Sequence, residues 1–219
     1  MKKVIVVAVC SLILAHCASA AVVTYTDRAS FEAQGTIVHN YGFEDVTLDS
    51  WGFYYAPNPW TTHGVTYTTG DNLVIGPAAE FTPLTNTLNY NSWTPVSGNI
   101  ETSPSHFDMF GLDLGYLDRD PTIGPMTFEI YTNLGTLALT GLYPPDAAQA
   151  MDFYGFVAGP GEYFTGFYVH ALDSLRYAPT LDNVTLGTRD ASGYIPEPAT
   201  LGLLGLGLTG LAAIRRRRK

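Results

Sequence analysis

The amino-acid sequence predicts an all-β protein built as an antiparallel β-sandwich, with one short helix near the N-terminus and an apolar helix at the C-terminus. Between Ala21 and Tyr194 the segments are short, rich in Val, Ile, Thr, Tyr and Phe, and separated by Gly, Pro, Asn and Asp. Turn residues at intervals of about eight to twelve residues are typical of antiparallel sandwiches. All the aromatic residues (14 Tyr, 11 Phe, 3 Trp) also lie in this stretch, which supplies the apolar bulk of a core.

Residues 26–35 begin with a capping residue, contain helix formers and end at a glycine, so they predict one short helix. The stretch 76–105 is dense in Pro, Thr, Asn and Ser, and it predicts long loops. Strands are predicted near 22–25, 36–42, 64–68, 72–75, 106–114, 125–131, 135–140, 151–157, 163–170 and 180–187.

The clearest predicted hairpin turns at Thr132–Gly135. Before the turn Thr127, Glu129 and Tyr131 alternate with three apolar residues. Because successive side chains of a strand point to opposite faces, this alternation predicts one apolar and one polar face.

Residues 1–20 are typical of an export signal. A basic start precedes twelve apolar residues, Val4–Ala15, and the segment ends in an A-x-A cleavage pattern, so we expect a mature chain that begins at Ala21. Twelve residues of helix span about 18 Å, short of a hydrocarbon core of about 30 Å, which disfavours a retained anchor.

Both cysteines, Cys10 and Cys17, lie in this signal. The mature chain then has no thiol, although it enters a compartment that permits disulfides, and thiol catalysis and cysteine-ligated zinc are excluded. Lipidation at Cys17 is an alternative, but His16 before it fits a lipobox poorly.

The body, residues 21–194, is strongly acidic. It contains four arginines, no lysine and 19 acidic residues, for a net charge of −15. Without a basic patch to neutralise phosphates, nucleic acid is excluded as a partner. A body of 174 residues is the size of a single domain.

The C-terminal segment, 195–219, combines a Pro-Glu-Pro tripeptide, sixteen mostly apolar residues (Ala199–Ile214) and a basic tail. A helix of sixteen residues reaches about 24 Å, which is short of a relaxed membrane span but tolerable if the arginines snorkel. The basic tail predicts that this end stays in the cytoplasm.

This segment resembles the PEP-CTERM sorting signal of Gram-negative, biofilm-forming bacteria. The resemblance implies processing by an exosortase, a transient stay in the inner membrane, and delivery to the cell surface or extracellular matrix. The residues that carry it are Pro196, Glu197, Pro198, Arg215, Arg216, Arg217 and Arg218.

The body itself resembles jelly-roll domains of the galactose-binding or carbohydrate-binding-module kind. The segments that carry this resemblance are 26–33, Tyr41–Glu44, Phe107–Leu114, Phe153–Phe156 and Leu181–Val184. It implies a structural calcium between the first and last strands, with Glu44 and Asp182 as ligands, and carboxylates are the oxygen ligands that calcium prefers. The alternative is that both carboxylates sit at strand ends and face solvent.

A second acidic group consists of Asp113, Asp118 and Asp120. Asp-x-Asp in a turn could bind calcium, but no EF-hand spacing follows and Arg119 lies between two of the carboxylates. A solvated turn is therefore the favoured interpretation.

Five aromatic residues fall within 51–60, in an expected loop. Rings with polar tips suit stacking on a sugar, which makes Trp51, Tyr54, Tyr55 and Trp60 candidate glycan-binding residues. The alternative is that they cover the open end of the sandwich as a small core.

Catalytic motifs are missing from the body. Its histidines, at 39, 63, 106 and 170, lack zinc-site spacings, and no nucleophile elbow, P-loop or dinucleotide fingerprint occurs. We therefore expect a non-catalytic, exported structural or adhesive protein. The alternative is a carbohydrate-binding module or glycan-active enzyme that binds extracellular polysaccharide, because two suitably spaced carboxylates among 19 acids are enough for a glycosidase.

Overall fold

The computed structural model describes residues 22–78, 85–88, 95–103, 106–116, 125–142, 151–171 and 179–190. These residues lie in one unit, Ala21–Asp190. The predicted export signal and the predicted C-terminal sorting segment lie outside the described residues.

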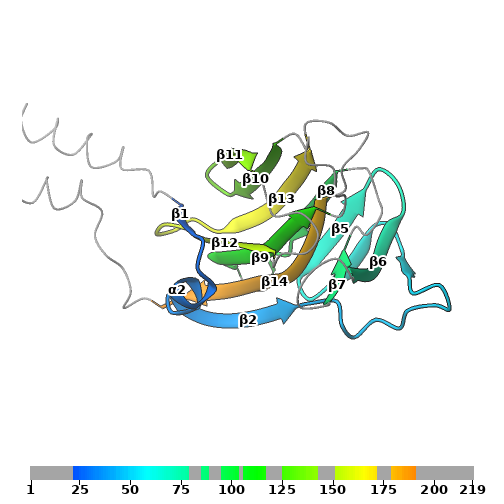
Figure 1. Cartoon of the computed structure of the whole chain (residues 1–219). Helices are drawn as coiled ribbons and strands as arrows, with labels where there is room; N and C mark the ends of the chain where they lie inside the picture. The colour runs from blue at the N-terminus through cyan, green and yellow to red at the C-terminus, as the bar shows by residue number, and fades with distance from the viewer. Residues whose placement is uncertain are drawn as a thin grey trace, which may run out of the picture. The chain divides into compact units, whose positions relative to one another are not determined.

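The described strands form two sheets that pack face to face. The strands of the larger sheet are β1 (Val23–Tyr25), β2 (Gly35–Tyr41), β3 (Tyr54–Ala56), β6 (Leu73–Ala78), β7 (Thr85–Leu88), β9 (Met109–Tyr116), β12 (Asp152–Val157) and β14 (Pro179–Arg189). Those of the smaller sheet are β4 (Trp60–Thr62), β5 (Val65–Thr69), β8 (Val96–Ile100), β10 (Met126–Thr132), β11 (Thr136–Leu142) and β13 (Phe164–Ala171). Figure 1 shows β10, β11 and β13 in one layer and β9, β12 and β14 in the other.

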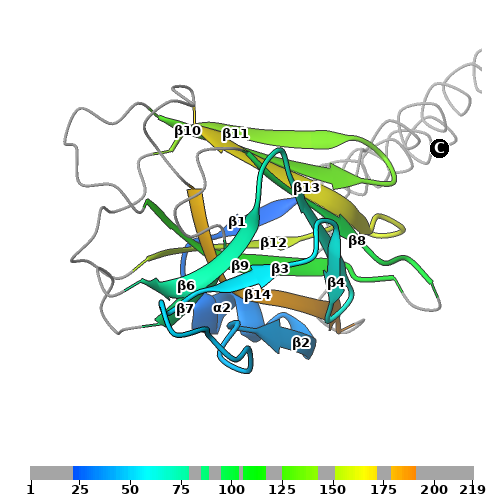
Figure 2. The same cartoon turned by 90° about the vertical axis from the view of Figure 1, so that its right-hand side faces the viewer.

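Pairing is antiparallel throughout the described strands. The larger sheet runs in the order β1-β12-β9-β14-β7-β6-β3, with β2 also paired to β14, and the smaller in the order β11-β10-β13-β8-β5-β4. Figure 2 shows the smaller sheet from β10 and β11 across to β4. The predicted all-β sandwich is confirmed.

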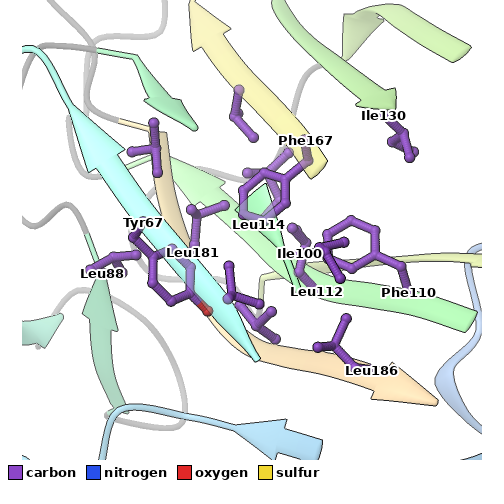
Figure 3. Packing of buried hydrophobic residues seen from close by; sticks show 14 of the residues in the cluster. Tyr67, Leu88, Ile100, Phe110, Leu112, Leu114, Ile130, Phe167, Leu181 and Leu186 are labelled. Atoms are coloured by element: carbon purple, nitrogen blue, oxygen red, sulfur yellow. The ribbon is translucent and has the colours of Figure 1, made fainter. Parts of the chain in front are cut away.

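The core lies between the two sheets and follows from the two-residue period of the strands. In β10, for example, Met126, Phe128 and Ile130 are all 0 % exposed. Phe110 of β9 stacks on Phe167 of β13 with ring centres 5.1 Å apart, as the packing in Figure 3 shows. Each such side chain contributes about 1.5–3 kcal/mol on burial.

β14 organises the larger sheet because both of its edges are paired. β9 lies along one edge, while β7 pairs at Leu181 and β2 pairs from Val184 to Arg189 along the other. Its register with β9 shifts between Asp182 and Thr185, which marks a bulge. This bulge lies between the part of β14 that pairs with β7 and the part that pairs with β2. A bulge often changes the direction in which a side chain points.

The one described helix, α2 (Arg28–Glu32), packs on the outer side of the larger sheet. Phe31 is 0 % exposed and forms a small second core with Met109, Phe153 and Val157. A Cβ on Gly155 would come 2.7 Å from Phe31 Cδ2, so the absence of a side chain there makes room for the ring. Asp27 Oδ1 accepts a hydrogen bond from Ser30 N at 2.8 Å and is the N-cap.

The predicted loops need correction in two places. The stretch 76–105 contains β7, β8 and the end of β6, and 51–60 contains β3 and the start of β4. Val96 and Ile100 of β8 point into the core, and Gly98 between them leaves the space that the Phe167 ring fills. A strand with glycine at an inward position shows little apolar alternation, which explains the wrong prediction.

The remaining predicted elements are found within the described residues. The ten predicted strands correspond to β1, β2, β5, β6, β9, β10, β11, β12, β13 and β14. The hairpin turns at the predicted residues, since Thr132 N donates to the Gly135 carbonyl at 2.8 Å. The helix is shorter than predicted and ends at Glu32.

Candidate functional site

A polar cluster joins α2 to the larger sheet. Arg28 Nη2 donates to Asp113 Oδ1 of β9 at 2.8 Å, and Arg28 Nη1 donates to Thr185 Oγ1 of β14 at 3.1 Å. The guanidinium carbon lies 4.4 Å from the centre of the Phe153 ring, a cation–π contact. The Arg28 and Asp113 side chains are 27 % and 17 % exposed, so water screens this pair less than an open surface pair.

Asn183 completes this cluster at the bulge of β14. Its Nδ2 donates to Asp113 Oδ2 at 2.8 Å, and its backbone N donates to Asp182 Oδ1 at 2.7 Å. Its φ of 47° is in the left-handed region, which Asn tolerates better than most residues. Arg28 and Asn183 therefore engage both oxygens of Asp113, and the cluster fastens α2, β9 and β14 to one another.

The sequence indicated only parts of this cluster. Asp113 and Asn183 belong to separate predicted motifs, and Arg28 lies in the predicted helix 26–35 without a predicted partner. The usable signal was the rarity of arginine in the body, since a rare cation among 19 acids is expected to pair.

The predicted calcium ligands, Glu44 and Asp182, come from neighbouring segments. A Cβ on Gly42 would lie 3.4 Å from Asp182 Oδ1 and 3.0 Å from Asn183 Oδ1. Asp182 is 2 % exposed, whereas Glu44 is exposed and its Oε1 accepts a hydrogen bond from Asn86 N at 2.8 Å.

The fit to calcium is partial. Calcium takes six to eight oxygens, and two carboxylates supply only some of them. Within the described residues there is no group of three or more His, Cys, Asp or Glu side chains that could hold a metal ion. Backbone carbonyls would have to supply the other ligands, and the calcium site stays a prediction.

Of the second predicted acidic group, the structure describes Asp113. Asp118 and Asp120, with Arg119 between them, lie outside the described residues. Asp113, its third member, belongs to the polar cluster with Arg28 and Asn183.

The candidate glycan-binding residues divide into two environments. Trp51 and Tyr55 are 83 % and 61 % exposed. Tyr54 and Trp60 are half-buried and pack against the core, with their ring centres 6.1 Å apart. The turn that displays Trp51 is held by Asp49, whose Oδ1 accepts hydrogen bonds from the backbone N of residues 51 and 53.

Two histidines that are distant in sequence lie close together. The His39 and His63 ring centres are 6.1 Å apart, and His63 stacks on Tyr41 at 4.0 Å. His63 Nδ1 lies 2.7 Å from Thr62 Oγ1. Sequence spacing did not indicate this pair, because His39 lies in β2 of the larger sheet and His63 lies between β4 and β5 of the smaller one.

Several ionisable groups have shifted pKa values. Burial raises the pKa of Tyr41, and the hydrogen bond that its hydroxyl donates to Asp45 at 2.7 Å raises it further. The hydrogen bond to Glu129 raises the pKa of Tyr131 to about 12. Burial raises the pKa of Asp152. Both tyrosine hydroxyls therefore remain protonated at neutral pH and act as hydrogen-bond donors.

The part of the chain that the structure describes includes no helix of sufficient length and apolarity to cross a membrane. The predicted membrane helix, Ala199–Ile214, lies outside that part. A protein-family comparison matches residues 195–218 to the PEP-CTERM protein-sorting motif. No curated protein and no solved structure matches the chain.

Proposed function

We propose that the body, residues 21–194, is a non-catalytic structural or adhesive component of the cell surface or extracellular matrix. The chain carries a PEP-CTERM protein-sorting motif after the body, at residues 195–218. The motif marks an exported protein and implies an exosortase as the enzyme that processes it. Beyond export, we propose that the chain stays transiently in the inner membrane, that it ends at the cell surface or in the extracellular matrix, and that its body has a structural or adhesive role there.

The observation that carries this proposal is the use of charged groups inside the body. Arg28 and Asn183 both donate hydrogen bonds to the Asp113 carboxylate, and these bonds fasten the helix to the sheet. Glu162 is 8 % exposed, and its Oε1 accepts a hydrogen bond at 2.7 Å from the Oγ1 of Thr132, the last residue of β10. Groups engaged in this way stabilise a scaffold, which favours a structural role.

An adhesive role is supported by what the scaffold displays. Trp51 and Tyr55 are exposed aromatic rings, and rings of this kind contribute strongly to binding. The net charge of −15 keeps the body soluble and limits its nonspecific attachment to anionic polymers.

Fractionation of cells that express the chain with an internal tag tests the sorting part of this proposal. We expect the body at the cell surface or in the medium, and we expect replacement of Pro196 and Glu197 by Ala to hold it in the membrane fraction. Thr209→Ala, in the apolar stretch, is the matched control. A mature body in the cytoplasm would contradict the proposal.

Co-sedimentation with the extracellular matrix tests the adhesive part. We expect purified full-length chain to sediment with matrix from the same cells and to remain there after washing. A chain that stays in the supernatant would contradict an adhesive role.

A second candidate function is carbohydrate binding, or catalysis on glycans, through residues 51–60. The exposure of Trp51 and Tyr55, at 83 % and 61 %, favours this candidate. It predicts that Trp51→Ala and Tyr55→Ala lower the affinity for a polysaccharide without a change in melting temperature. A glycan-active enzyme would also release reducing sugars, which the non-catalytic function forbids.

Structural calcium is a separate proposal that rests on Glu44 and Asp182. A metal that binds only the folded chain raises its melting temperature, and the rise grows with the logarithm of the metal concentration. We expect calcium to raise the melting temperature, chelation to reverse the rise, and Glu44→Gln to abolish it. An unchanged melting temperature in calcium would exclude this site.

A further inference from the structure

The outer face of the smaller sheet is made of the strand residues that alternate with the core. In β8, for example, Val96 and Ile100 are buried, whereas Ser97 is half-buried and Asn99 is exposed. The same alternation applies to β5, where Val65 and Tyr67 are buried. The residues between the buried positions therefore point away from the core.

The strand register arranges these residues in rows. The first row crosses all six strands and consists of Thr61, Thr66, Asn99, Gly166, Tyr131 and Thr136. The second consists of Thr68, Ser97, Tyr168, Glu129 and Ala138, and beyond it lie His170 and Thr127. We call these residues the outer polar face. With strands about 4.8 Å apart, the first row extends over about 24 Å.

Most of the outer polar face is accessible to a ligand. Thr61, Asn99, Thr136 and Ala138 are exposed, whereas Thr127 and Gly166 are buried and the others are half-buried. Thr61 Oγ1 and Thr66 Oγ1 lie 2.8 Å apart, so hydroxyls of neighbouring strands come within hydrogen-bond distance. Such a row offers donors and acceptors at close intervals.

Three rings lie among these hydroxyls. The Tyr168 and His170 ring centres are 5.1 Å apart. A Cβ on Gly166 would be 3.6 Å from Tyr131 Cδ2 and only 2.7 Å from the Gly98 carbonyl oxygen. Glycine is therefore required at 166, and the edge of the Tyr131 ring lies over it.

The charge of this face differs from that of the body. The body has a net charge of −15, but the outer polar face contains a single carboxylate, that of Glu129. Its Oε2 accepts a hydrogen bond from the Tyr131 hydroxyl at 2.7 Å. With no lysine or arginine on the face, a polyanion finds no counter-charge, and an uncharged ligand fits best.

We propose that the outer polar face binds a segment of an uncharged polysaccharide that lies along the rows. Sugar rings would stack on Tyr131 and Tyr168, because the C–H face of a sugar packs well on an aromatic ring. Sugar hydroxyls would exchange hydrogen bonds with Asn99, Ser97 and the threonines. This inference rests on the proposed adhesive function and names its ligand class and its site.

Affinity electrophoresis of the full chain tests this proposal. The native gels contain hydroxyethylcellulose or galactomannan, both uncharged, or alginate, a polyanion. The chain is purified in a detergent without a sugar headgroup, so that the detergent does not compete. We expect an uncharged polysaccharide to retard the chain and alginate to have little effect.

Matched variants assign the binding to the face. Tyr131→Ala and Tyr168→Ala should each weaken binding about tenfold, the loss expected for one stacked ring. Tyr131→Phe, which keeps the ring and removes the hydrogen bond to Glu129, should retain most of the affinity. Val38→Ala, at an exposed position of β2 in the larger sheet, is the matched control and should bind like the parent chain, whereas Trp51→Ala tests the separate aromatic segment. The melting temperature of each variant shows whether it is folded.

Four results of the electrophoresis would overturn the proposal. In the first, both tyrosine variants are retarded as strongly as the parent chain, and in the second, only Trp51→Ala abolishes the retardation. In the third, alginate retards the chain as strongly as an uncharged polysaccharide does. In the fourth, no uncharged polysaccharide retards the chain. Self-association that the tyrosine variants abolish would assign the face to a second copy of the chain and would also overturn it. If the chain still sediments with matrix in these cases, the adhesive function stands without this ligand. If it does not sediment, both proposals fail.

Discussion

Trp51 and Trp60 belong to the same aromatic segment, yet their side chains lie in different environments. Trp51 is 83 % exposed. The Trp60 ring centre lies 6.1 Å from that of Tyr41 and 6.2 Å from that of Phe43. The sequence left open whether the segment covers the core or displays its rings. At the residue scale it does both, because Trp60 begins β4 and packs against the core, whereas Trp51 lies in the turn before β3 that Asp49 holds.

Exchange of each tryptophan for alanine separates the two environments. Trp60→Ala should lower the free energy of unfolding by about 3 kcal/mol, because it removes a large ring packed on the core. Trp51→Ala should change it by less than about 0.5 kcal/mol. Urea denaturation of both variants measures the difference, and equal losses would show that the exposed ring also carries stability.

Asp113 is the residue on which the polar cluster depends. Asp113→Ala leaves Arg28 and Asn183 without their acceptor, and removal of a partner from a shielded charged hydrogen bond costs about 2 kcal/mol. We expect that loss in chemical denaturation. Asp71→Ala, at an exposed loop position, is the control and should be close to neutral. A neutral Asp113→Ala would mean that the cluster does not fasten the helix.

At the scale of elements, α2 depends on the glycines beneath it. A Cβ on Gly155 would be 2.7 Å from Phe31 Cδ2, and one on Gly111 would be 3.3 Å from Phe31 Cε1. Five residues are too few for a stable isolated helix. The helix therefore forms because Phe31 and Arg28 attach it to the sheet.

Gly155→Ala should displace Phe31 and lower the free energy of unfolding by about 1–3 kcal/mol. Gly135→Ala is the matched control, since a Cβ there would meet no atom within 4 Å. Phe31→Leu should restore part of the loss in the Gly155→Ala background, because it shortens the clashing side chain. Thermal denaturation followed by circular dichroism measures all three. If Gly155→Ala and Gly135→Ala behave alike, the packing of α2 does not depend on this close approach.

At the scale of the whole molecule, one core serves both sheets. The buried cluster includes Phe110 and Leu186 of the larger sheet and Phe128 and Phe167 of the smaller one. A shared core of this kind predicts that the body unfolds as one cooperative unit.

A chain reduced to residues 21–194 should therefore fold without the export signal and the sorting segment. We expect a single cooperative thermal transition and a β-type circular dichroism spectrum. The full chain in detergent provides the comparison, and its transition should lie within a few degrees. Two separate transitions, or no cooperative transition, would contradict a single folding unit.

Much of the fold and some of the candidate site could be predicted from the sequence. β10 was predicted correctly because its apolar period is local and complete, and the hairpin after it because Thr132–Gly135 forms the turn. β8 was missed because its inward Gly98 is explained only by the Phe167 ring of β13. The Arg28 cluster was missed because the sheet brings together residues that are 85 and 157 positions apart.

The sequence by itself determined that this is an acidic all-β body with a C-terminal sorting motif, because composition, alternation and a terminal motif are local properties of the chain. Only the tertiary structure decided which aromatic residues are buried and which are displayed, and which polar residues share a face. The rows of the outer polar face exist because strand register aligns residues such as Thr66, Asn99 and Tyr131. Register results from long-range pairing in the fold, and no short segment of the sequence contains it.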